Sequence, residues 1–320
     1  MGLTMQKSHP AREGACIYIS YSFVLCWKLP LPALLKPHYD GYVSATRVGD
    51  STFSCWCMTS HHIWLPYMMG KPLRHILKEF PLLQSQMEEL SQPGPLLTLK
   101  IMWQMMVNLT SSYSNAHKLE GHTFSRNEVD DWEEIGGKLV HFAEGELLTF
   151  LKPEEAADRA IAVGNKFSKL APSNCLGMIE TFHRGVALYI MARKTKKRKY
   201  KTHASRIRKT IKKWLQAGNP NVEHYSLLLD AEHAALGRAY ASAEKLYAEA
   251  IAIATRMEYL HHAALINERY ADFLLNERDD PERASYYLDE AIRLYEQWGA
   301  TRKIKILQSD LNRSLAFQRS

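Results

Sequence analysis

The chain has 320 residues and a mass of 36.7 kDa, and 46% of its residues are hydrophobic, 23% charged and 10% aromatic. This composition is typical of globular proteins, and it excludes a chain that is disordered throughout, a collagen-like fibre and a disulfide-stapled miniprotein. Lys and Arg number 41 against 34 Asp and Glu, so the formal net charge is +7.

The excess positive charge is local. Residues 193–213 contain twelve Lys or Arg and no acid, so this segment carries +12 and the rest of the chain −5. The five cysteines are irregularly placed, and their odd number favours a reducing compartment. We therefore expect an intracellular, cytoplasmic protein, and the RKTKKRK stretch, which resembles a nuclear-localisation signal, leaves a nuclear location open.

Residues 1–37 show no convincing hydrophobic period, and we expect a poorly ordered or irregular N-terminal segment. The longest apolar stretch, residues 15–27, has thirteen residues, well short of the roughly 20 that cross a membrane. The small-residue cleavage pattern of a signal peptide does not follow it. No membrane span is predicted.

Residues 38–170 are predicted to be helical but irregular. Asp50 has the position of an N-cap for a helix over 53–68. Prolines open a long amphipathic stretch over 96–119, and glycines interrupt another over 128–150.

Residues 171–310 carry a repeated helical pattern. Apolar or small residues follow the spacing i, i+3, i+4, i+7, i+8, i+11 from Ala243, and the spacing recurs 41 residues later from Ala284. Another apolar stripe precedes each of these helices. Because two helices joined by a short turn cannot bury both faces alone, stacked pairs must supply the core. We predict an all-α solenoid of antiparallel helix pairs, followed by a tail over 311–320.

Turn signals separate the predicted helices. Gly218 and Pro220 combine a left-handed helix stop with a proline suited to the first turn of the next helix. Asp280 is placed to cap the helix that follows it. Near the end of the pattern, a large ring that should pin the corner, a helix-terminating glycine and a helix former follow one another as Trp298, Gly299 and Ala300.

From residue 182 onward the chain resembles a known family. The succession FHRGVALYIMARKTKKRKY, AEKLYAEAIAIATR, AALINERYADFLL and ASYYLDEAIRLYEQWGATRKIKIL is similar to the tetratricopeptide-like helical array of large multidomain signalling ATPases. The resemblance extends over roughly residues 38–308 and implies a tetratricopeptide-like α-solenoid. Its most specific part is a YxxWGAxxKxxxL pattern formed by Tyr295, Trp298, Gly299, Ala300, Lys303 and Leu307.

In that family a protein-kinase-like domain and an AAA-type ATPase precede the array, and a GAF domain with a histidine kinase or nucleotide cyclase often follows. The present chain has no GxxxxGK[ST] phosphate loop, no kinase HRD or DFG sequence and no phospho-acceptor histidine in the family's Ser-His-Glu context. None of the family's catalytic residues is therefore carried over. We predict no catalytic, cofactor-binding or metal-binding residues, and no cofactor.

Cys55, Cys57, His61 and His62 are the only dense cluster of metal-capable side chains in the sequence. On a helix, Cys57 and His61 share a face and Cys55 lies away from both, which gives two ligands rather than a closed tetrahedral zinc site. We therefore favour buried thiols and surface imidazoles.

Glu232 and Glu268 lie on the apolar stripes of two first helices, 36 residues apart. Equivalent positions of a solenoid stay about 10 Å apart, so these carboxylates are not expected to share a catalytic cleft. Because an unpartnered buried charge is costly, we predict that each accepts a hydrogen bond from an interior Tyr, Trp or Arg. His261 and His262 are expected to lie in a turn, and aromatic residues at helical spacing are expected in the core: Tyr247, Tyr287, Tyr295, Trp214 and Trp298.

The basic segment allows three interpretations. It is either a solvated linker between helices, a surface that attracts an acidic partner, nucleic acid or anionic lipid, or a specific nucleic-acid reader. The last is disfavoured, because the segment contains no DNA- or RNA-binding motif and few interleaved aromatic residues. The candidate basic patch consists of Arg193, Lys194, Lys196, Lys197, Arg198, Lys199, Lys201, Arg206, Arg208, Lys209, Lys212 and Lys213.

We expect a non-catalytic interaction and regulatory module of a signal-transduction protein, with a protein partner that the sequence does not identify. In such an array each repeat contacts its neighbours and offers a concave surface. The alternative suggested by the resemblance is a fragment of a signalling enzyme whose ATPase, kinase or cyclase domains lie outside this chain. Binding of nucleic acid or an anionic surface through residues 193–213 is a third interpretation, less favoured than the other two.

Overall fold

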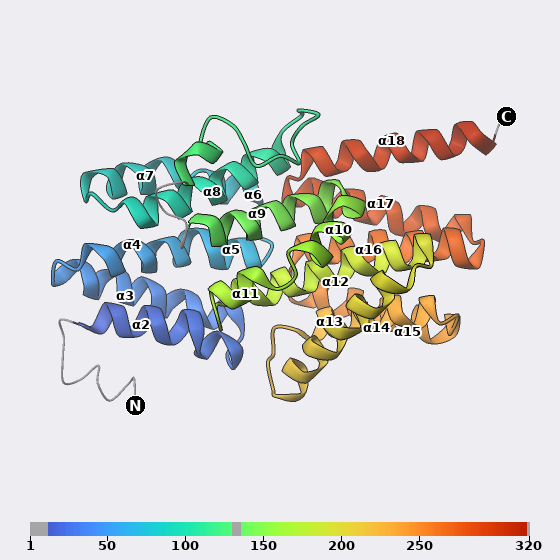
Figure 1. The fold of residues 1–320 in the computed structure, drawn as a ribbon, viewed down its shortest axis with the longest axis horizontal. Coiled ribbons are helices and arrows are strands. Elements are labelled where there is room, and N and C mark those ends of the chain that lie inside the picture. The colour runs from blue at the N-terminus through green and yellow to red at the C-terminus, as the bar shows by residue number, and fades with distance from the viewer. Residues whose placement is uncertain (1–11, 130–135, 319–320) are drawn as a thin grey trace.

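The structure is a computed structural model that describes residues 12–129 and 136–318, and within those ranges the regular elements are all helices (Figure 1). The first half contains α2 (Glu13–Phe23), η2 (Leu25–Trp27), η3 (Leu31–Leu34), α3 (Leu35–Arg47), α4 (Ser51–Thr59), η4 (Ser60–Trp64), α5 (Leu65–Met68), α6 (Leu73–Leu77), α7 (Phe80–Glu89), α8 (Pro93–Thr110) and η5 (Arg126–Val129). The second contains α9 (Gly136–Leu151), α10 (Pro153–Ala162), α11 (Lys166–Leu170), α12 (Leu176–Thr195), α13 (Arg198–Gln216), α14 (Glu223–Leu236), α15 (Tyr240–Arg256), α16 (Leu260–Phe273), η6 (Leu274–Arg278), α17 (Pro281–Trp298) and α18 (Thr301–Gln318). Among the described helices, none is both long enough and apolar enough to span a membrane.

The N-terminal segment differs from the prediction. Residues 1–11 lie outside the described ranges, but residues 13–23 form α2, which packs against α3 and α4. The contact is close because α2 contributes Gly14, where an added Cβ would lie 2.6 Å from the Cβ of Ala45. The sequence of α2 shows no clear helical period, because apolar residues also lie on its outer face, where Ile19 is 51% exposed.

The helices of residues 38–170 match the predicted positions only in part. Asp50 caps α4 as predicted, because its carboxylate accepts a hydrogen bond of 3.1 Å from the backbone N–H of Phe53. The helix expected over 96–119 instead begins at Pro93 and ends at Thr110, where the polar run SSYSN favours a turn. Of the helix expected over 128–150, residues 128 and 129 belong to η5, residues 130–135 lie outside the described residues, and α9 extends over Gly136–Leu151.

In the C-terminal half, helices that follow one another pack in pairs: α12 with α13, α14 with α15, and α16 with α17. The pairs also contact each other, through α13 with α14 and α15 with α16. A non-glycine residue in the left-handed region follows the first helix of each pair, with a spacing of 42 and then 41 residues: Lys196, Arg238 and Asp279. The helix-pair repeat that the spacing predicted therefore recurs in the backbone conformation.

The turn between α13 and α14 is only partly as predicted. Gly218 has a φ of +85°, as expected of a helix stop, but α14 begins at Glu223, so Pro220 lies in the turn and not in the first turn of the helix. Asn221 anchors this turn to the N-terminal segment, because its amide donates to the carbonyls of Cys26 and Leu29. Asp280 caps α17 as predicted.

The corner at Trp298 ends the last pair. Trp298 is completely buried, with ring centroids 5.1 Å from Phe150 and 6.2 Å from Tyr67, so it packs against both α9 and α5. Gly299 has a φ of +96° and ends α17, and buried Ala300 leads into the next helix. That helix, α18, runs through residue 318, so the tail predicted after residue 310 is a continuation of it.

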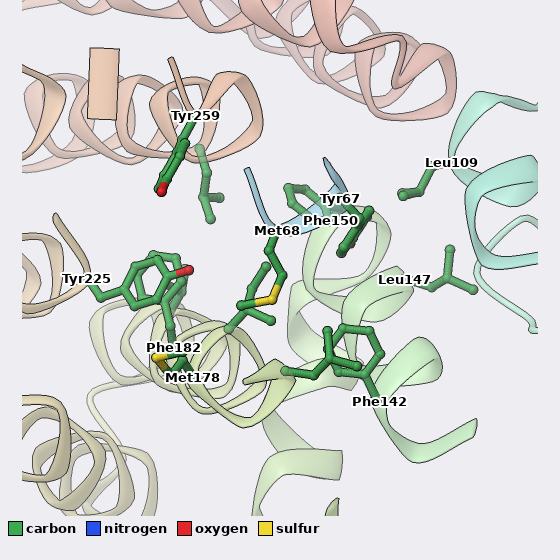
Figure 2. Close-up of a cluster of buried hydrophobic side chains, with 14 of the residues drawn as sticks. Tyr67, Met68, Leu109, Phe142, Leu147, Phe150, Met178, Phe182, Tyr225 and Tyr259 are labelled. Carbon is green, nitrogen blue, oxygen red and sulfur yellow. The ribbon is translucent and has the colours of Figure 1, made fainter. Parts of the chain in front are cut away.

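One hydrophobic core connects the two halves of the described chain. Figure 2 shows its centre, where side chains from α5, α8, α9, α12 and α14 meet. Phe182 of α12 stacks on Tyr225 of α14 with ring centroids 4.1 Å apart. Buried residues of this core extend from Cys26 to Leu307, so the helices before and after residue 170 share one core.

Candidate functional site: the cationic face of α13

The basic segment forms the end of α12, a short turn and most of α13. Lys196 ends α12 in the left-handed conformation, and α13 begins at Arg198. Tyr200, Ala204, Ile207 and Ile211 are the buried residues of α13, and their spacing of four, three and four places them on one face. The basic residues between them consequently lie on the sides and the outer face of the helix.

Arg193 does not belong to this surface, which corrects the predicted patch. It is 6% exposed and its guanidinium lies 3.1 Å from the carboxylate of Glu232 and 3.2 Å from that of Asp272. Arg269 donates a hydrogen bond of 2.8 Å to the other oxygen of Glu232. These four side chains, from α12, α14 and α16, form a charge cluster in which Arg193, Glu232 and Arg269 are buried and Asp272 is partly exposed.

The two arginines control the ionisation of Glu232. Burial opposes its charge most strongly, but the attraction of Arg269 and Arg193 together outweighs burial, so the pKa of Glu232 lies below its usual value. The hydrogen bond predicted for Glu232 is present, and Arg269 donates it. Glu268 also accepts the predicted bond, 2.8 Å from the hydroxyl of Tyr295, and a second of 2.7 Å from buried Lys303.

The two glutamates do not form an acid–base pair, since Glu232 is held by arginines and Glu268 by Tyr295 and Lys303. The cysteine–histidine cluster of α4 and η4 is also divided among other contacts. Cys55 and Cys57 are buried, whereas His62 pairs with Glu79 at 3.0 Å. Within the described ranges, no three His, Cys, Asp or Glu side chains are arranged to hold a metal ion.

Acidic residues of neighbouring helices neutralise part of the basic segment. Lys199 and Tyr200 share Asp158 of α10, at 3.1 and 2.6 Å, and these hydrogen bonds lower the pKa of Asp158. Asp230 of α14 pairs with both Arg208 and Lys212. The remaining pairs are Lys194 with Glu154 and Lys196 with Glu277.

Six basic residues of the segment are exposed and have no ion-pair partner among the described residues: Lys197, Arg198, Lys201, Arg206, Lys209 and Lys213. Four of them line a single groove together with Lys196 and the hydroxyl residues Thr202 and Ser205. No carboxylate is among the described residues that line this groove. We call it the cationic groove (Lys196, Arg198, Lys201, Thr202, Ser205, Arg206 and Lys209).

A second groove adjoins the first and shares Lys196 and Lys201 with it. Its lining also includes the uncharged Ala192, Ala235, Leu236 and Tyr240 and the charged Arg238 and Glu277. We call it the apolar groove, since it offers contacts to uncharged side chains beside the cationic groove. Sequence reasoning missed Arg238, although it lies 42 residues after Lys196 in the same left-handed position of the next repeat.

The chain matches no protein-family model, no curated protein and no solved structure. The site is therefore interpreted from its own residues.

Proposed function

We propose that this chain is a non-catalytic interaction module, a tetratricopeptide-like solenoid of antiparallel helix pairs that binds an acidic segment of a partner protein on α13. The observation that carries the proposal is the cationic groove, where five basic side chains converge without a carboxylate among the lining residues. Clustered charge of one sign attracts and orients an oppositely charged partner.

An acidic polypeptide fits the surroundings of the groove better than a nucleic acid does. A continuous phosphate backbone would meet the carboxylates of Glu154, Asp158 and Glu277, which border the basic segment. A polypeptide can place its acids in the cationic groove and an uncharged side chain against Leu236 and Tyr240 in the apolar groove. Association of this kind weakens as salt concentration rises.

The test is fluorescence anisotropy of a labelled peptide of alternating Glu and Leu, titrated with the full chain at 50 and 150 mM salt. The triple variant Lys201→Glu, Arg206→Glu and Lys209→Glu is expected to bind at least about tenfold more weakly, a loss of about 1.4 kcal/mol. The matched control makes the same change of net charge at exposed residues elsewhere: Arg47→Glu, Arg74→Glu and Lys78→Glu.

Equal weakening by both triple variants would show that only net charge matters and would overturn the proposal. A duplex DNA of random sequence, with the same net charge as the peptide, serves as the competitor. Tighter binding of that duplex than of the peptide at 150 mM salt would assign the surface to nucleic acid instead.

A further inference from the structure

Four histidines are buried together where the C-terminal helix pairs meet the rest of the molecule. His183 lies on α12, His224 on α14, and His261 and His262 on the first turn of α16, each at most 1% exposed. The last two were expected in a turn, but α16 begins at Leu260 and both rings are buried. We call these four residues the histidine cluster.

The rings contact one another directly. His261 and His262 stack with centroids 3.7 Å apart, and a nitrogen of His224 lies 3.1 Å from a nitrogen of His262. His183 and His262 have centroids 5.6 Å apart. A proton added to one ring would therefore place a positive charge against several other imidazoles.

In the part of the chain that the structure describes, one carboxylate faces the cluster, and it is already engaged. Glu146 of α9 lies 2.6 Å from Nδ1 of His183 and accepts a hydrogen bond of 2.7 Å from the hydroxyl of Tyr67 on α5. The other ionisable groups around the cluster are the phenols of Tyr225 and Tyr259 and the exposed pair of Lys71 and Glu258, at 3.5 Å, beside the start of α16. None of these offers His224, His261 or His262 a carboxylate of its own.

Several ring nitrogens have no hydrogen-bond partner among the described residues. They are Nε2 of His183, Nδ1 of His224, both nitrogens of His261 and Nε2 of His262. Burial lowers the pKa of His224 to about 3, and burial with the charge of neighbouring histidines lowers the pKa of His261 and His262 well below the usual value. All three rings are consequently neutral in the folded state at neutral pH.

The cluster lies at a joint between helices. The ring of His261 packs between those of Trp298, at the end of α17, and Tyr67 of α5. The ring centroids are 5.2 Å and 6.0 Å from that of His261. The turn after α5 approaches closely because it has Gly70 at a φ of +65°, where an added Cβ would lie 2.4 Å from Nδ1 of His261. We propose that His224, His261 and His262 form an acid-sensitive joint that holds α14–α17 against α5, α9 and α12 while the rings are neutral, and opens when they take up protons.

The expected size of the effect follows from proton linkage. A ring that is neutral when the joint is closed and titrates normally when it is open raises the opening constant about tenfold between pH 7.5 and 5.5. Three such rings give about a thousandfold. The direction is fixed, because the open state binds more protons: closure is strongest above the ordinary histidine pKa and weakens as the pH falls below it.

The first test is hydrogen–deuterium exchange of the full chain at pH 7.5 and 5.5, corrected for the intrinsic effect of pH on exchange. We expect protection of α14 and α16 to fall by two to three orders of magnitude at pH 5.5, while α7 and α8 keep most of theirs. Retained protection in α14 and α16, or an equal loss in all four helices, would overturn the proposal.

The second test is urea unfolding of His261→Phe at both pH values, with His122→Gln as the control at an exposed histidine. The Phe variant loses no hydrogen bond made by the described residues and keeps an aromatic ring on Trp298. Its unfolding constant should change about tenfold less with pH than that of the wild type. A pH dependence within twofold of the wild type would contradict the inference, and the exchange experiment decides the matter even if this variant does not fold.

Discussion

Arg193 and Lys209 come from the same run of basic residues, and their surroundings are opposite. Arg193 is enclosed by three acidic residues of α14, α16 and η6, whereas Lys209 faces solvent at the edge of the cationic groove. The difference shows that charge density in a sequence does not by itself locate a surface. What decides the environment is the face of the helix on which each residue lies.

The sequence contained a signal for the buried arginine. Phe182, Gly185, Val186 and Tyr189 form the apolar stripe of α12, and Arg193 is the next position of that stripe, eleven residues after Phe182. A cation on an apolar stripe implies buried acids opposite it. Glu232 also lies on such a stripe. The sequence therefore shows both members of the ion pair, but not that they contact each other.

The sharpest way to test this contrast is to remove the central carboxylate. Glu232→Gln would remove the only fully buried carboxylate that Arg193 and Arg269 share among the described residues, and would leave them the partly exposed Asp272. We expect the free energy of unfolding to fall by about 3–5 kcal/mol, as is typical when one member of a buried pair is removed. Urea denaturation followed by circular dichroism measures this quantity.

The matched control is Glu249→Gln on α15, where the carboxylate is exposed and pairs with Lys245 at 3.8 Å. Its expected effect is below about 0.5 kcal/mol, because surface pairs contribute little. If both substitutions changed stability by the same small amount, the charge cluster would not be the structural element that we describe.

A second buried cation allows a smaller version of the same test. Lys303 of α18 is 3% exposed and donates to Glu268 at 2.7 Å. Lys303→Met keeps the apolar stem but leaves Glu268 with only the hydroxyl of Tyr295, and should cost about 1.5–3 kcal/mol of unfolding free energy. Lys305→Met, two residues away and exposed, should be nearly neutral in the same denaturation experiment. If Lys303→Met lowered the free energy of unfolding no more than Lys305→Met does, Lys303 would not contribute to the stability of the corner.

Sequence periodicity was sufficient for the helical class and for the repeat of α15 and α17, because buried Ala and Tyr recur there at the same spacing, from Ala243 to Ala254 and from Ala284 to Tyr295. It failed for α2, where exposed apolar residues such as Ile19 hide the buried face. It also failed for His261 and His262, since imidazoles are common in turns and only the contact with Gly70 and Trp298 explains their burial.

The candidate site was predictable in composition but not in extent. The run of basic residues identified α13, yet the acids that pair with half of the run come from α10, α14, α16 and η6, 18 to 84 residues away in the chain. Such pairings depend on how helices pack and not on local pattern. Arg238 and Tyr240 join the site for the same reason.

The smallest expected effect tests the exposed side of the comparison. Lys209 and Lys213 lie one helical turn apart on α13 with no acid between them, so their charges repel each other. Lys209→Gln should raise the free energy of unfolding by about 0.2–0.5 kcal/mol, the usual size of such a pair, while weakening the binding of the acidic peptide. On α15 the same spacing joins Lys245 to Glu249, so Lys245→Gln should lower stability by a similar amount. If Lys209→Gln raises the free energy of unfolding and Lys245→Gln lowers it, α13 keeps charge on its surface that destabilises the fold, as we expect of a binding face. A loss of stability from Lys209→Gln would contradict this.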